Sequence, residues 1–210
     1  RVEPLLAAEM PDVSSDGLVW QFRLREGIRF SDDPCFAETG GKGRELVAQD
    51  FVYAILRIAD LKVGSGGYWV YRGKIAGLDD FREASRGEAP PDYDQPVAGL
   101  RAVGPHELEL HLTEPYPQLP WVLAMPYAFA VPREAVEFYG PEFVNHPVGT
   151  GPYVLAAAQQ NYRYEYRANP QWQETGRIDA MPADAPTPDA GKPLPLAPRI
   201  VDSVVGDPST

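Results

Sequence analysis

Proline and glycine limit this chain to short helices and strands. The 210 residues include 23 Pro and 19 Gly, which together make up a fifth of the sequence. Proline breaks the interior of a helix or a sheet, and glycine weakens both, so long regular elements are excluded. Hydrophobic residues still make up 44% and charged residues 23%, which is typical of a folded soluble domain. We therefore predict a mixed α/β fold with short elements and many ordered turns.

The charge balance narrows the range of partners. The chain carries 30 acidic and 19 basic residues, which give a formal net charge of −11. Nucleic acids and anionic membrane surfaces bind clustered Lys and Arg, so neither is an expected partner. No stretch approaches the ~18 apolar residues that a membrane-spanning helix needs. Cys35 is the single cysteine, which excludes an internal disulfide and a Cys-based zinc site.

Alternation of apolar and polar residues predicts several half-buried strands. These segments are 20–25 with a continuation at 28–30, 100–103, 107–112, 153–158, 162–167 and 200–205. Gly104 and Pro105 are turn residues, so the two segments beside them are predicted to form a hairpin. The strand at 162–167 alternates three tyrosines with Arg163, Glu165 and Arg167. It is predicted to pack its tyrosine face, with a stacking platform for a ligand as the alternative.

A longer period predicts the helices. Apolar residues in 48–60 recur at the spacing of one helical face, which indicates an amphipathic helix. Asp50 lies in its first turn, where a carboxylate suits the helix dipole. Shorter helices are expected at 78–86, 118–125 and 132–139. The apolar residues 128–131 are expected to form a buried strand.

Two segments are expected to be loops, and both ends resemble the interior of a protein. The loops are residues 31–47 and the Pro-, Ala- and Asp-rich residues 173–198. The sequence opens on Arg1 without an initiator Met or a signal peptide. We therefore expect a piece of a longer protein, with a small natural protein that has lost its leader as the alternative.

An aromatic cluster is the first candidate binding site. Tyr68, Trp69 and Tyr71 follow a glycine-rich loop. Aromatic side chains with polar tips suit a solute pocket, because they cover apolar groups and also form hydrogen bonds. The alternative is a small aromatic core beneath the loop, and the residues alone do not decide between the two.

A glycine-containing turn is the second candidate. It comprises Gly149, Thr150, Gly151, Pro152 and Tyr153. The glycines allow a positive φ or a close backbone approach, and the proline fixes its own φ. We favour a structural corner that directs the tyrosine into the core, with a position beside a binding cleft as the alternative.

Other polar residues give no catalytic or metal signature. His106, His111 and His146 do not share metal-ligand spacing, so no metal site is predicted. Cys35 lacks a partner motif, so it is not expected to be a nucleophile. The glycine-rich segment 40–44 has neither the following Ser or Thr nor the preceding strand of a phosphate loop. We predict no cofactor and no enzymatic activity.

Four segments, in this order and spacing, resemble one protein family. They are the strand segment 20–32, the helix 48–57, the turn Pro147–Tyr153 and the element Asn169–Trp172. Together they resemble the family 5 extracellular solute-binding proteins, which are the oligopeptide- and dipeptide-binding receptors of bacterial ABC importers. The turn alone is moderately specific, whereas the four motifs in order are strongly specific.

The resemblance implies a lobe fragment of a type II periplasmic-binding-protein-like fold. It maps residues 12–146 to an inserted α/β subdomain, and residues 1–11 and 147–210 to the main lobe. Family members are usually more than twice as long, so the C-terminal half of the receptor would be missing. The whole receptor would close two lobes around a peptide or similar solute, on the periplasmic or extracellular face of a bacterial membrane. It would deliver the solute unchanged to ABC permease subunits, and this chain alone is expected to bind weakly or not at all.

Departures from the family pattern leave alternatives open. Val47 stands where the family helix opens with Thr, so another cap such as Glu45 must serve, or the first turn frays. The element at 169–172 lacks the tyrosine of the family. A nickel chelate, an oligosaccharide or haem therefore remain alternative solutes. A second hypothesis makes the chain a protein-interaction or regulatory module that acts through the loops 31–47 and 173–198.

Overall fold

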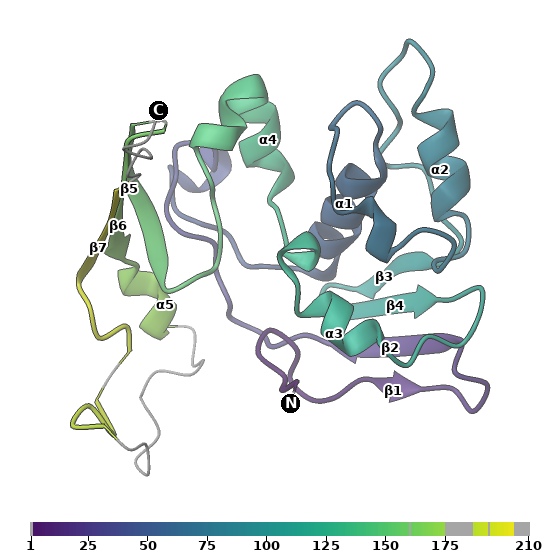
Figure 1. The fold of residues 1–210 in the computed structure, drawn as a ribbon, viewed down its shortest axis with the longest axis horizontal. Coiled ribbons are helices and arrows are strands. Elements are labelled where there is room, and N and C mark those ends of the chain that lie inside the picture. Colours follow the sequence, from purple (N-terminus) through teal and green to yellow (C-terminus); the bar gives the residue numbers. More distant parts are fainter. Residues whose placement is uncertain (1, 160, 175–186, 193, 204–210) are drawn as a thin grey trace, which may run out of the picture. The chain divides into compact units, whose positions relative to one another are not determined.

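The chain divides into two compact units, each built from two stretches of sequence. The computed structural model describes residues 2–159, 161–174, 187–192 and 194–203. Unit 1 comprises Arg1–Glu26 and Leu46–Arg133, and unit 2 comprises Gly27–Glu45 and Glu134–Thr210. Figure 1 labels the helices and strands of both. The mixed α/β fold class is confirmed.

A four-stranded antiparallel sheet with the order β1-β2-β4-β3 forms the framework of unit 1. The strands are β1 (Asp12–Val13), β2 (Val19–Arg23), β3 (Leu100–Gly104) and β4 (Glu107–His111). The register sets Leu110 opposite Trp20 and Leu108 opposite Phe22. One face of the sheet is therefore apolar, as the alternation predicts. The hairpin of β3 and β4 is also confirmed.

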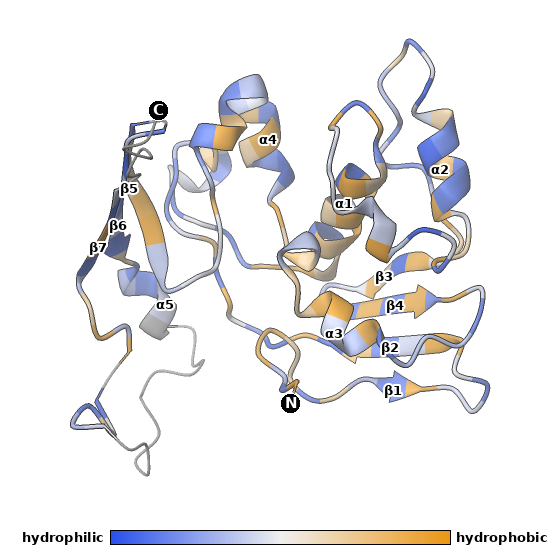
Figure 2. Cartoon of the chain, in the orientation of Figure 1, coloured by the Kyte–Doolittle hydropathy of each residue, from blue (hydrophilic) through white to orange (hydrophobic). Residues whose placement is uncertain are grey.

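Helices bury the apolar side chains of this sheet. They are α1 (Ala48–Ala59), α2 (Leu78–Ala84) and α3 (Leu119–Leu123), with the 3-10 turns η2 (Tyr68–Val70) and η3 (Pro126–Ala128). α1 packs against β3 and β4, and its Ile55 joins Leu110 in the core. Figure 2 shows the apolar residues along α1 and α3 in orange. The three helices lie where the sequence predicts them.

Asp50 caps the start of α1. The Val47 backbone N–H donates to Asp50 Oδ2 at 2.9 Å, and the Ala48 N–H donates to the Pro105 carbonyl oxygen at 2.7 Å. Glu45 instead accepts a hydrogen bond from the Gly27 N–H. A cap other than the family's Thr is present, as expected, and it is the Asp50 carboxylate, which satisfies an N–H group at the start of the helix.

A three-stranded antiparallel sheet with the order β5-β6-β7 belongs to unit 2. Its strands are β5 (Tyr153–Gln159), β6 (Arg163–Ala168) and β7 (Arg199–Ser203), which confirms the strands predicted there. Asn161 has a φ of 60° in the β5–β6 connection, a conformation that Asn tolerates better than most residues. The helical elements are η1 (Ala37–Thr39), α4 (Arg133–Tyr139), η4 (Gly140–Asn145) and α5 (Pro170–Glu174).

One predicted strand is wrong. Residues 128–131 form no strand, because η3 extends to Ala128 and Phe129 is 61% exposed. Pro126 and Pro132 flank this short segment, and proline cannot donate to a sheet ladder. Apolar composition alone therefore does not make a strand here.

The expected subdomain boundaries differ from those of the two units. Residues 27–45 group with unit 2, whereas the resemblance maps them to a continuous subdomain at 12–146. That mapping concerns the lobes of a whole receptor and stays a prediction. Half of the predicted loop at 173–198, residues 175–186 and 193, lies outside the described residues. Within the part of the chain that the structure describes, no helix combines the length and apolar character needed to cross a membrane.

Candidate functional site

Two of the three predicted aromatic site residues lie in the core of unit 1. Tyr68 is 6% exposed and Tyr71 is 1% exposed. The Tyr71 hydroxyl donates to the Tyr127 carbonyl oxygen at 3.1 Å, and the Tyr68 hydroxyl donates to Asp79. Burial, together with the Asp79 carboxylate, raises the pKa of Tyr68 above its ordinary value. These features match the alternative of an aromatic core beneath the loop.

Trp69 differs from its two neighbours. The Trp69 side chain, on η2, is 66% exposed. The ring of the neighbouring Tyr68 is instead covered by the guanidinium of Arg82, which lies 4.1 Å from the ring centroid. Gly67 lets the loop approach this core closely, because a methyl group there would lie 2.3 Å from the Tyr127 ring. Trp69 thus keeps the accessibility that a ligand contact requires, and its role stays a prediction.

Within the described residues, the conformation of the Gly149–Tyr153 turn does not require glycine at position 149 or 151. Neither Gly149 nor Gly151 has a positive φ. A methyl group at either position would meet no atom of the described residues within 4 Å. The expected positive φ and close approach are therefore not found. The turn is held through its carbonyl groups instead.

Asn169 joins this turn to a second motif. Its side-chain amide donates to the Gly151 carbonyl oxygen at 2.9 Å, and its backbone N–H donates to the Pro152 carbonyl oxygen at 2.8 Å. The Asn169 side-chain oxygen accepts from the Gln171 N–H at 3.2 Å at the start of α5. Asn169 is 3% exposed, so one buried amide serves both segments.

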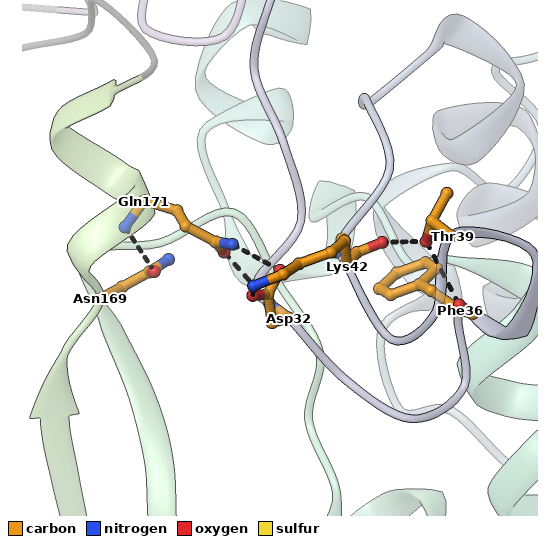
Figure 3. A network of polar contacts seen from close by, with 7 residues as sticks. Asp32, Phe36, Thr39, Lys42, Asn169 and Gln171 are labelled. Carbon is orange, nitrogen blue, oxygen red and sulfur yellow. Dashed lines mark hydrogen bonds and ion pairs between the residues drawn. The ribbon is translucent and has the colours of Figure 1, made fainter.

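The segment after Phe30 completes the junction. The Ser31 N–H donates to the Gly149 carbonyl oxygen at 2.9 Å, and the Asp32 N–H donates to Gln171 Oε1 at 3.1 Å. The Gln171 side-chain amide donates back to the Asp32 carboxylate, as Figure 3 shows. We call residues 31–32, 149–153 and 169–172 the motif junction, because three of the four motifs meet there.

Asp32 holds the charge of the motif junction. Its carboxylate accepts from Lys42 Nζ at 2.7 Å and from the Gly43 N–H at 2.9 Å (Figure 3). Partial burial opposes ionisation, but the hydrogen bonds from Lys42, Gln171 and Gly43 outweigh it and lower the pKa of Asp32 to about 2. The carboxylate is therefore ionised at neutral pH and is already occupied by donors of this chain.

Further contacts anchor residues 27–45 within unit 2. Arg44 forms a two-pronged ion pair with Glu134 on α4, in which Arg44 Nη2 lies 2.8 Å from Glu134 Oε2. The Arg44 guanidinium also lies 5.2 Å from the centroid of the Phe30 ring. The Tyr139 hydroxyl lies 3.0 Å from each carboxylate oxygen of Asp33. Side-chain contacts therefore fix residues 27–45 within unit 2.

Cys35, His111 and His146 each lie against other side chains of this chain. Burial, reinforced by the Asp33 carboxylate, raises the pKa of the Cys35 thiol to about 12, so the thiol is protonated at neutral pH and is a poor nucleophile. His111 Nε2 lies 2.5 Å from Glu109, and the His146 ring stacks on Tyr139. Among the described residues, no three His, Cys, Asp or Glu side chains are arranged to hold a metal ion.

Unit 1 also contains an apolar groove that the sequence does not predict. Its volume is about 300 Å³, and apolar residues of the N-terminal segment, β2, α1 and α3 line it. Leu5, Met10 and Phe129 lie along it with exposures of 43%, 51% and 61%. The groove suits an apolar group. Five stretches of sequence line it, including Leu108 of β4, so no local pattern reveals it.

The comparisons with known proteins agree with the motifs. The family model for the bacterial extracellular solute-binding proteins, family 5, middle region, matches residues 1–205. The periplasmic oligopeptide-binding protein OppA of Salmonella typhimurium is 32% identical over 168 residues, which cover 78% of this chain and 28% of that protein. The dipeptide-binding protein of Escherichia coli is 28% identical over 194 residues, covering 87% of this chain and 32% of that protein.

Solved structures show the same fold. Listeria monocytogenes OppA bound to peptide superposes with a TM-score of 0.68 at 20% identity, over 95% of this chain and 33% of that chain. An oligopeptide-binding protein of Borrelia burgdorferi gives a TM-score of 0.67 at 21% identity, over 95% of this chain and 33% of that one. The chain thus spans about a third of the length of these proteins. With the family model matched over nearly its whole length, this chain belongs to the bacterial extracellular solute-binding proteins of family 5.

Proposed function

We propose that this chain is part of a receptor that captures peptides outside the cytoplasm and delivers them to an ABC importer. The family match over residues 1–205 carries this proposal. Relatives named for oligopeptide and dipeptide binding make a peptide the favoured solute over a nickel chelate, an oligosaccharide or haem. The periplasmic location named for OppA supports a place outside the cytoplasm.

The proposed role is capture without chemistry. The family is described as solute-binding, and a thiol whose pKa is raised to about 12 does not supply a nucleophile at neutral pH. The polar groups of the motif junction bind one another, as Asn169 does with Gly151 and Asp32 with Gln171. We infer that the junction positions the segments of unit 2 and does not act on the solute.

The relatives are much longer than this chain, so the solute site would be formed by this chain together with further segments. This chain spans about a third of OppA and of the dipeptide-binding protein. A receptor that encloses its solute uses surfaces on both sides of a cleft and closes them by a hinge motion. We therefore propose that the solute site of the whole receptor needs further segments, and that permease subunits bind the closed receptor.

The interaction-module hypothesis receives less support. It requires the loop 31–47 to be available for a partner, yet Asp32, Asp33 and Arg44 all bind groups within unit 2. Half of the second loop of that hypothesis, 173–198, lies outside the described residues. Peptide capture therefore remains the better account of the described chain.

Calorimetric titration tests the proposal. A mixture of tri- to pentapeptides is titrated into the 210-residue chain and, separately, into a whole receptor that contains it. We expect clear binding by the whole receptor and much weaker binding by the 210 residues. Equal affinity of the two proteins would contradict the division of the site. Failure of the whole receptor to bind peptides, together with binding of a nickel chelate, an oligosaccharide or haem, would contradict the choice of solute.

A further inference from the structure

One face of the β5-β6-β7 sheet gathers arginines around a single carboxylate. Arg199 Nη2 lies 2.5 Å from Glu165 Oε2, Arg167 Nε lies 3.5 Å from Glu165 Oε1, and Arg163 Nη2 lies 3.9 Å from Glu165 Oε2. The three guanidinium groups therefore share one acidic partner. The hydrogen bond from Arg199, together with the charges of Arg199 and Arg167, lowers the pKa of Glu165.

The strand register places these four residues on one face. Arg163, Glu165 and Arg167 occupy every second position of β6. Arg199, on β7, lies directly opposite Arg167. Their other direct partners are uncharged: Val154, Ala157 and Gln159 on β5, and Val201 and Ser203 on β7. We call this the arginine face. Counting its three arginines and one glutamate gives a local charge of +2, in a chain of net charge −11.

Glu109 is shared by Arg101 and His111, whereas Glu165 contacts three arginines. Arg23 with Glu9, Arg133 with Asp94 and Lys74 with Glu114 each join one base to one acid. On the arginine face the side chains of Arg163, Arg167 and Arg199 are 44%, 69% and 50% exposed, whereas Glu165 is 16% exposed. The Glu165 carboxylate is thus largely covered by three guanidinium groups, which are themselves accessible to solvent. Figure 2 shows the hydrophilic colour along β6.

The geometry points to a docking surface for an acidic protein segment on the arginine face. Guanidinium forks bind carboxylates with two parallel hydrogen bonds, and one half-buried glutamate leaves most of these donors available. Arg163 and Arg167 are four residues apart on a strand, so their α carbons are roughly 13 Å apart, while their guanidinium groups both approach Glu165. An extended segment with two or more Asp or Glu side chains can follow the strand over this length and meet several guanidinium groups at once, and its charge is complementary to the face.

Glu165 gives this inference a directional test. Its carboxylate competes with any external carboxylate for the same three guanidinium groups, so it should weaken binding of the external one. Removing its charge should therefore strengthen docking, whereas removing two of the arginines should weaken it. A merely structural cluster would not respond in opposite directions, because both changes would only loosen the sheet.

The probe is a rhodamine-labelled hexaglutamate peptide, and its fluorescence anisotropy is measured with the 210-residue chain at low salt. The test variants are R163Q/R167Q and E165Q. The matched control is R23Q/R101Q, which removes two exposed arginines of unit 1. A charge-retaining variant, R163K/R167K, separates the guanidinium fork from net charge. Thermal melting checks that each variant is folded.

We expect hexaglutamate binding by the parent chain that weakens with added salt. R163Q/R167Q should weaken it about tenfold, given the small worth of each exposed ion pair. E165Q should strengthen it, R163K/R167K should weaken it less than the glutamine variant, and the control should leave it unchanged. No binding by folded parent chain, equal loss in the control, or weaker binding by folded E165Q would overturn the inference. Full displacement of the peptide by inorganic phosphate at equal concentration, or a preference for anionic lipid vesicles, would also overturn it.

Discussion

The Asn169 side-chain amide donates a hydrogen bond to the carbonyl oxygen of Gly151, 18 residues earlier in the chain, at 2.9 Å. This bond joins two segments that the sequence marks as separate motifs. Because Asn169 is 3% exposed, water does not readily replace the donor if it is lost. The motif junction therefore makes a stability contribution that can be measured.

Replacing Asn169 with Ala should destabilise the chain by about 1–3 kcal/mol, the usual effect of leaving buried polar groups unsatisfied. Asn169→Asp should also be destabilising, because it keeps the acceptor for Gln171 and loses the donor to Gly151. Urea denaturation measures both. Asn145→Ala, which removes an exposed hydrogen bond to Glu142, is the control and should stay within about 0.5 kcal/mol of the parent. Equal effects at both positions would contradict the role of the junction.

Gly151 should tolerate alanine. Its φ is not positive and its Cβ direction is open among the described residues. Gly151→Ala should therefore leave stability unchanged or raise it by about 0.4–1 kcal/mol, through a smaller entropy of the unfolded chain. Gly43→Ala is the contrast, because its Cβ would lie 1.9 Å from the Phe30 carbonyl oxygen. Denaturation of both variants tests this, and a severe loss at Gly151 would show that the backbone there needs glycine.

Asp32 should contribute to acid sensitivity. Its pKa in the folded chain is about 2, below the value of about 3.9 for an unfolded chain. A lowered pKa stabilises the fold above pH ~4, and that contribution is lost as the pH falls from ~4 to ~2. Asp32→Asn should therefore flatten the fall in melting temperature across this range. Lys42→Gln should do so less, because Gln171 and Gly43 still donate to the carboxylate. Parallel curves for Asp32→Asn and the parent would contradict the assignment.

Trp69 and Tyr71 should separate binding from stability. Tyr71→Ala should cost about 3–5 kcal/mol, as expected for a buried aromatic residue. Trp69→Ala, at a side chain that is 66% exposed, should change stability by less than about 0.5 kcal/mol. If Trp69 contacts the solute, the same substitution should weaken peptide binding by a whole receptor. Unchanged calorimetric affinity in that receptor would remove Trp69 from the site.

Local periodicity predicts the parts of this fold that depend on neighbouring residues. α1 lies at Ala48–Ala59 because its apolar residues share one helical face, and β3 and β4 meet at the predicted turn. The error at Phe129 has the same origin. Apolar residues there were expected to form a strand, but a strand also needs a partner edge, which a local pattern does not contain.

Contacts between distant residues could not be predicted in this way. Arg44 pairs with Glu134 across 90 residues, and Asp32 meets Gln171 across 139. These pairs hold residues 27–45 within unit 2. The aromatic cluster shows a related limit, because the sequence places Tyr68, Trp69 and Tyr71 in one cluster and favours Tyr68 and Trp69 as ligand contacts. Only the packing against Tyr127 and Asp79 separates the buried residues from the exposed one.

Mass spectrometry of the captured material tests the central claim most directly. A whole receptor containing this chain is purified under native conditions and denatured, and the released small molecules are identified. The account predicts peptides of varied sequence and unaltered covalent structure. Release of a single non-peptide solute, such as a nickel chelate, an oligosaccharide or haem, with no peptides present, would contradict it.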